Sequence, residues 1–179
     1  LGSAGLAFLY SGDMIAFIVT IICSLIGYFG RTLSVRFGCN EYVGIALGGF
    51  AAMVSAYGFY SHIEQASLVY VLVCCTLFMI PGVPLINAVI DTINNHILSG
   101  ITRAIRTILI VGSMTLGMAM ALYFSPMPAF SFVDIKPHVL SIEQIIGAFT
   151  AAASFAVLFN APVRLLVSIG IGGILCVFI

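Results

Sequence analysis

The chain has 179 residues, of which 62% are hydrophobic and only 7% are charged, and its mean hydropathy is +1.24. Soluble domains carry about a quarter charged residues, so this composition excludes a soluble domain and indicates an all-α integral membrane protein. Six basic and six acidic side chains cancel to a net charge of zero, which offers no electrostatic basis for binding nucleic acid.

Charges, prolines and polar clusters divide the chain into apolar stretches of about 20 residues, the length that crosses the hydrocarbon core as a helix. We expect residues 1–10 to be the exit of a first helix, because the chain begins inside an apolar pattern, as a fragment of a longer protein would. The other expected helices form a polytopic bundle and cover residues 14–30, 42–60, 66–84, 104–124, 144–159 and the stretch from 163 onward.

Arginines distinguish the two sides of this expected bundle. If each helix crosses once, the loops 31–41 and 85–106 and the turn 160–164 share one side. That side holds Arg31, Arg36, Arg103, Arg106 and Arg164, whereas the other side holds only Lys136. Because Lys and Arg in short loops mark the cytoplasmic side of a membrane, we predict that the five-arginine side is cytoplasmic.

Two segments near the ends of the chain resemble each other. "AGLAFLYSGDMIAFIVTIICSLIGY" (4–28) and "ASFAVLFNAPVRLLVSIGIGGILCVFI" (153–179) align so that Ala4 falls on Ala153, Tyr10 on Phe159 and Ser11 on Asn160. Five spans separate the copies, which predicts inverted five-helix repeats, an arrangement typical of secondary transporters with a substrate site at the repeat interface. The alternative is that any two membrane helices joined by a tight turn look alike.

The predicted domain organisation follows from this repeat. We expect a first membrane half over residues 1–126, a connecting loop over 127–143 and the truncated start of a second half over 144–179.

The stretch "FMIPGVPLINAVIDTINNH" (78–96) concentrates Pro81, Gly82 and Pro84 within four residues. Proline removes a helical hydrogen bond and clashes with the preceding turn, so we expect a broken fourth helix that is non-helical at 81–84. In a bilayer the freed carbonyls are tolerated only where protein or a wet cavity meets them. The break is therefore a candidate substrate site.

A polar stripe follows the break. Asn87, Asp91 and Asn94 share one helical face, and the amide of Asn87 could meet both the ammonium and the carboxylate of an amino acid. An acid within or beside the membrane usually marks a proton or substrate path, so Asp91 is the candidate proton-coupling group. The alternative is that the stripe lies in the cytoplasmic interface, with Asp91 paired to Arg103 or Arg106; both hold if the segment is a half-helix folding back under a cavity.

Other function classes are less well supported. An intramembrane aspartyl protease would need Asp13 and Asp91 close enough to share a proton, and the expected topology puts them near opposite surfaces. His62, His96 and His138 lack the HExxH spacing of a zinc enzyme. The sequence does not distinguish a passive channel from a carrier; a counterflow experiment with labelled substrate would do so.

Two motifs resemble a known family. "IPGVPLINAVIDTINNHILSGITRAIRTILI" and "SFAVLFNAPVRLLVSIGIGGIL" are similar, in that order, to the bacterial threonine/serine exporter family. The resemblance implies ten membrane helices in two homologous halves, located in the bacterial inner (plasma) membrane, with amino-acid export by antiport against protons. In some members the halves are separate polypeptides, and relatives have been connected with export of dicarboxylates such as succinate.

The resemblance also implies site residues and partners. Pro81, Gly82, Pro84, Asn87 and Asp91 would form the broken-helix site, and Asn160 with Pro162 the matching turn. It implies no cofactor and no metal. The implied partners are a small amino acid or organic acid, protons and the lipid bilayer, and the sequence leaves open whether the chain forms a homo-oligomer or pairs with a separate membrane half.

Overall fold

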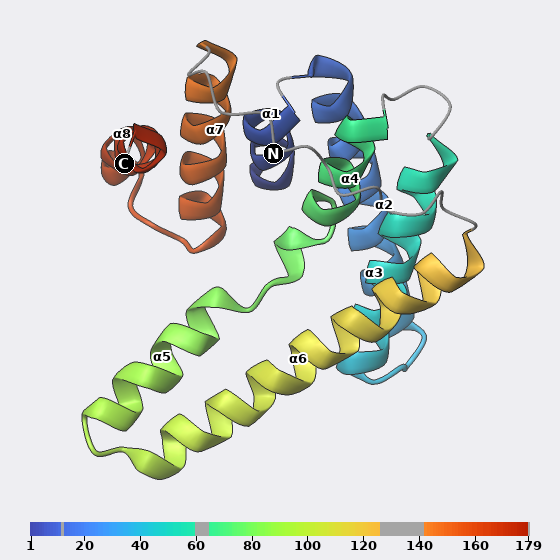
Figure 1. The fold of residues 1–179 in the computed structure, drawn as a ribbon. Helices are drawn as coiled ribbons and strands as arrows, with labels where there is room; N and C mark the ends of the chain where they lie inside the picture. The colour runs from blue at the N-terminus through green and yellow to red at the C-terminus, as the bar shows by residue number, and fades with distance from the viewer. Residues whose placement is uncertain (12, 60–64, 126–141, 179) are drawn as a thin grey trace.

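The computed structural model describes residues 1–11, 13–59, 65–125 and 142–178, and these residues form helices and turns without a strand (Figure 1). The α-helices are α1 (Gly2–Ser11), α2 (Met14–Arg36), α3 (Glu41–Gly58), α4 (Gln65–Cys74), α5 (Gly82–Ile93), α6 (Ile97–Phe124), α7 (Ile142–Leu158) and α8 (Leu166–Phe178), with 3₁₀ turns η2 (Leu77–Met79) and η3 (Val163–Leu165). The predicted all-α fold is confirmed. Among the described helices, α2 and α6 are long and apolar enough to cross a membrane, and one bent pair makes a third candidate span.

Three predicted helix boundaries were clearly wrong. Helix α2 continues to Arg36, helix α5 continues past residue 84 to Ile93, and helix α6 already begins at Ile97. The four arginines of the predicted loops 31–41 and 85–106 therefore lie within helices. Hydropathy marks only the part of a helix that crosses hydrocarbon, whereas arginine is a good helix former whose long side chain carries its charge to water. The connecting loop predicted at 127–143, with Lys136, lies outside the described residues apart from Ile142 and Glu143, which begin α7.

Small residues set the packing of the central helices. A Cβ at Gly27 of α2 would meet the Cβ of Ala52 on α3 at 2.8 Å, and a Cβ at Gly117 of α6 would run into the carbonyl oxygen of Ala46 on α3. Membrane helices associate through such close backbone approaches, because lipid provides little hydrophobic driving force between them. Helix α3 therefore lies tightly between α2 and α6.

Gly117→Ala is expected to lower the free energy of unfolding by about 1–3 kcal/mol, because the added methyl group meets backbone that cannot move aside. Gly112→Ala on the same helix is the matched control. Among the described residues, no atom outside the backbone of the helix itself lies within 4 Å of a Cβ at Gly112, so there alanine should be neutral or stabilise the helix by up to about 1 kcal/mol. Thermal unfolding in detergent measures both, and equal melting temperatures for the two variants would contradict the packing described here.

Helices α1 and α7 pack side by side and antiparallel (Figure 1). A Cβ at Gly2 would lie 3.4 Å from the Cβ of Ser154, and a Cβ at Gly5 would lie 2.6 Å from the nitrogen of Ala151. In the alignment of 4–28 with 153–179, Gly2 corresponds to Ala151 and Gly5 to Ser154, so each glycine faces the counterpart of the other. The turns that follow α1 and α7 consequently lie at opposite ends of this helix pair.

Glu41, at the start of α3, connects three helices at one end of the bundle. Its carboxylate lies 3.5 Å from Arg31 Nη2 on α2 and 3.1 Å from Arg106 Nη2 on α6. These side chains are all at least a third exposed, so each pair contributes little to stability. These pairs show instead that arginines from two of the predicted loop regions lie at the same end of the bundle.

Candidate functional site

The fourth span is broken, as predicted, and its two parts meet at an angle of 54°. Helix α4 ends at Cys74, the turn η2 follows, Ile80 is extended with ψ 122°, and Pro81 is the N-cap of α5. The predicted position of the break was wrong. Residues Gly82 to Pro84 form the first turn of α5 instead of a non-helical segment, and the break occupies residues 75–81.

The displacement of the break has a physical cause. Proline disrupts the turn that precedes it, because its ring clashes with the carbonyl four residues earlier, and it forces the residue before it out of the helical region. Pro81 therefore breaks the chain on its N-terminal side. Pro84 is tolerated as the third residue of α5, since N–H groups in the first turn have no helical partner to lose.

Carbonyl groups at the end of α4 accept hydrogen bonds from side chains. The Cys75 thiol donates to the Leu72 carbonyl at 3.2 Å, and the Thr76 hydroxyl donates to the Val73 carbonyl at 2.9 Å. The Cys75 carbonyl accepts a hydrogen bond from the Ser24 hydroxyl of α2 at 3.4 Å. Neighbouring protein groups thus satisfy the break, which bears out the expectation that a freed carbonyl faces a polar partner.

A cavity of about 460 Å³ lies beside the break, between α1, α2, η2 and α7. This volume falls within the range of small-molecule sites, which is about 300–1,000 Å³. Most of its lining is apolar, including Phe78 of η2 and Phe155 of α7, and three serines interrupt it. These are Ser3 on α1, Ser24 on α2 and Ser154 on α7.

Gly82 connects the break to the turn after α7. The nearest atom to a Cβ at Gly82 is Phe159 Cζ, at 3.8 Å, and the Phe159 ring stacks on Phe155 of the cavity wall with centroids 6.3 Å apart. In that turn Asn160 has a positive φ of 58° and is exposed, as is Pro162. The structure therefore brings the predicted turn to the break, but through Phe159 rather than through Asn160 or Pro162.

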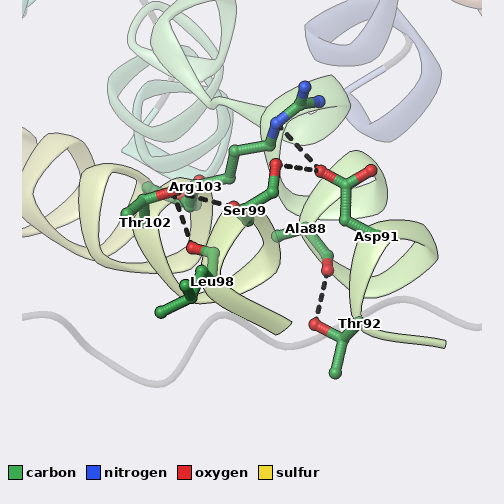
Figure 2. Close-up of polar contacts among 8 residues, drawn as sticks. Ala88, Asp91, Thr92, Leu98, Ser99, Thr102 and Arg103 are labelled. Carbon is green, nitrogen blue, oxygen red and sulfur yellow. Dashed lines mark hydrogen bonds and ion pairs between the residues drawn. The ribbon is translucent and has the colours of Figure 1, made fainter. Parts of the chain in front are cut away.

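Asp91 lies near the end of α5, facing the first turns of α6 (Figure 2). Its Oδ2 is 3.1 Å from Arg103 Nε and accepts a hydrogen bond from the Ser99 hydroxyl at 2.8 Å. The carboxylate side chain is 21% exposed and the arginine 47%. Of the two arginines considered from the sequence, Arg103 is the partner, while Arg106 binds Glu41. Both contacts are made by donors to the same carboxylate oxygen of Asp91.

The predicted site residues do not converge on one place. Pro81 is buried at the break, and Gly82, Pro84 and Asn87 are half-buried along the first part of α5, whereas Asn94 is the exposed C-cap. Nine residues of helix place Asp91 about 14 Å from Gly82. The region thus contains a cavity beside the break and a separate carboxylate–arginine pair at the far end of α5.

Sequence reasoning missed the three cavity serines. A single hydroxyl in an apolar helix, such as Ser24 within "IICSLIGY", often bonds within its own helix, and nothing in its spacing distinguishes it. Ser3 and Ser154 come together only because α1 and α7 pack antiparallel. The alignment of 4–28 with 153–179 predicted a substrate site at the repeat interface, but Ser3 lies just outside the aligned residues.

The two acids considered as a protease dyad are far apart. Asp13 is the N-cap of α2, where its side chain accepts from the Ile15 amide. Asp91 pairs with Arg103, which lies one helical turn from Arg106. Arg106 in turn contacts Glu41, which follows the C-terminal end of α2. Helix α2 alone is about 34 Å long, so Asp13 and Asp91 cannot share a proton.

Comparison with known proteins places this region within a family. The family model described as "Putative threonine/serine exporter" matches residues 1–125 of the chain. The match covers α1 to α6 and therefore includes the broken span and the Asp91–Arg103 pair. No curated protein and no solved structure matches the chain significantly.

Proposed function

Because the chain belongs to the threonine/serine exporter family, we propose that it exports a small amino acid of the threonine or serine type in exchange for protons. The observation that carries this proposal is the broken span inside the matched region, with a cavity of about 460 Å³ beside it. Secondary transporters bind their substrates near the membrane midplane at discontinuous helices. A break that opens onto a cavity of small-molecule size supports such a role here.

Asp91 is the proposed coupling group. In the described conformation its carboxylate pairs with Arg103 and accepts a hydrogen bond from Ser99. Protonation would remove the charge that attracts Arg103 and weaken the contact between the end of α5 and α6. Uptake of a proton on the outside and its release on the inside would then alternate with substrate export. Asn87, one turn closer to the break on the same face of α5, is proposed to contact substrate as α5 moves.

The packing of α1 against α7 supports the inverted repeat. Reciprocal contacts of Gly2 with Ser154 and of Gly5 with Ala151 are those of two equivalent helices related by a local two-fold axis. We accordingly propose that residues 1–126 belong to a first membrane half and that α7 and α8 begin a second, inverted half. With the arginine-rich end inside, the protein would be multi-pass in the bacterial inner membrane.

Transport by purified protein in proteoliposomes tests the function. The full-length protein is reconstituted into proteoliposomes, together with its other half where that is a separate polypeptide. The vesicles are loaded with labelled L-threonine or L-serine, and a pH gradient is imposed across their membrane. We expect the gradient to accelerate efflux several-fold and a protonophore to abolish that acceleration. Efflux of both amino acids at the rate of empty-vector liposomes would overturn the proposal.

Counterflow distinguishes a carrier from a channel in the same vesicles. A carrier should accumulate labelled threonine transiently against an excess of unlabelled threonine inside, whereas a channel should only equilibrate it. Efflux of labelled succinate without efflux of either amino acid would favour the dicarboxylate alternative.

A further inference from the structure

We propose that the cavity between α1, α2, η2 and α7 is the substrate site and that it selects a small zwitterion of zero net charge over a dicarboxylate. The proposal rests on the proposed function and assigns that function to residues outside the conspicuous Pro–Gly–Pro motif. It depends on three features of the cavity wall, namely a free buried hydroxyl, a polar link to the break and the absence of charge.

Ser3 supplies the free hydroxyl. The residue is only 4% exposed, lines the cavity, and makes no side-chain hydrogen bond within the described part of the chain. Every fully buried side-chain oxygen of the described residues has a partner, so the Ser3 oxygen keeps some accessible surface, and Ser3 lines the cavity. A hydroxyl that faces a small cavity can bond to water there, and a polar ligand group in the cavity could replace that water.

Ser24 connects the cavity to the break. It lines the cavity and donates to the Cys75 carbonyl at the end of α4, over a long distance of 3.4 Å. A serine hydroxyl also has acceptor lone pairs, so Ser24 can accept from a ligand ammonium while it holds the broken helix. A ligand bound to Ser24 would thereby change the hydrogen bond that Ser24 makes with the Cys75 carbonyl at the break.

Ser154 places the cavity at the contact between the two aligned segments. It lies on α7 against Gly2 of α1 and lines the cavity opposite Ser24 of α2. Three hydroxyls from three helices thus surround one space. A small amino acid with its own hydroxyl has enough donors and acceptors to bond with all three.

Charge decides between the two substrate classes. None of the twelve residues that line the cavity has a charged side chain. A dicarboxylate would bring two negative charges into a wall without a cationic side chain, and burying unpaired charge is far more costly than burying paired or neutral polar groups. A zwitterion carries its counter-charge with it, so hydroxyl groups suffice to bind it.

Single serine substitutions test the assignment in the proteoliposome assay. Ser3→Ala and Ser154→Ala are expected each to raise KM for threonine exchange about tenfold, the effect of one lost net hydrogen bond. Ser113→Ala is the matched control, because its hydroxyl only returns to the Leu109 carbonyl of its own helix, and its KM should stay that of wild type. Ser154→Leu, which fills the cavity, should reduce exchange to background while the protein keeps its elution profile in detergent.

Competition tests the selectivity. Excess unlabelled serine should inhibit threonine exchange, whereas succinate at the same concentration should not. Unchanged KM in both alanine variants, or inhibition by succinate as strong as by serine, would overturn the assignment of this cavity. Failure of wild-type protein to exchange any amino acid would instead overturn the proposed function, so the two failures are distinguishable.

Discussion

Replacing Asp91 with asparagine should abolish efflux driven by a pH gradient and leave exchange of internal for external amino acid measurable. Net export requires a proton to be taken up and released in each cycle, whereas exchange requires only that the loaded carrier reorient. Asparagine keeps the shape of the side chain and can still accept from Ser99, but it neither titrates nor attracts Arg103 as an ion. Proteoliposomes with and without an imposed gradient separate the two activities.

Glu41→Gln is the matched control for this prediction. Glu41 is also a carboxylate held by arginines, Arg31 and Arg106, at the same end of the bundle. If ion pairs there serve only to hold helices together, both variants should lose some stability and both should keep their response to pH. Proton-driven efflux that persists in well-folded Asp91→Asn protein would remove Asp91 from the coupling mechanism.

Gly82→Leu should reduce transport by more than about tenfold, a loss that corresponds to 1.4 kcal/mol. The closest atom to a Cβ at this position is Phe159 Cζ, at 3.8 Å, so a longer side chain must displace the Phe159 ring. That ring stacks on Phe155, which lines the cavity. The disturbance would therefore pass from the break into the space where substrate is proposed to bind.

Gly82→Ala is the control at the same position. Its methyl group makes an ordinary contact with Phe159, and it should transport nearly as well as wild type. The amount of folded protein, measured by size-exclusion chromatography, should be similar for both variants. Parallel loss of folded protein and of transport in Gly82→Leu would mean that the contact with Phe159 serves packing alone.

The sequence predicted features that depend on local chemistry. The composition indicated a membrane helix bundle, and Pro81, Gly82 and Pro84 predicted a broken fourth span. Likewise, the twelve-residue separation of Asp91 and Arg103 allowed the ion pair that the structure contains. The break was nevertheless placed too late, because all three breakers were treated alike, whereas proline acts on the turn before it.

Features that depend on tertiary contact could not be predicted in the same way. Hydropathy ended α2 at residue 30, although the helix continues to Arg36, since polarity marks the edge of the lipid and not the end of hydrogen bonding. Similarly, the cavity exists only because α1, α2, η2 and α7 meet beside the break. Its three serines come from segments separated by up to 151 positions in the sequence (Ser3 to Ser154), and no local pattern connects them.

The 28 residues of α6 make this helix about 42 Å long, whereas the hydrocarbon core of a bilayer is about 30 Å thick. Counted back from Phe124 at one interface, about 20 residues cross the core and the opposite boundary falls near Ile105. Arg103 and its partner Asp91 would then lie where acyl chains give way to headgroups. A thicker bilayer would draw this pair into hydrocarbon, where ionised side chains are more costly. The proposed proton coupling should accordingly change with the acyl-chain length of the lipids, so the membrane itself would help to set the proposed transport rate.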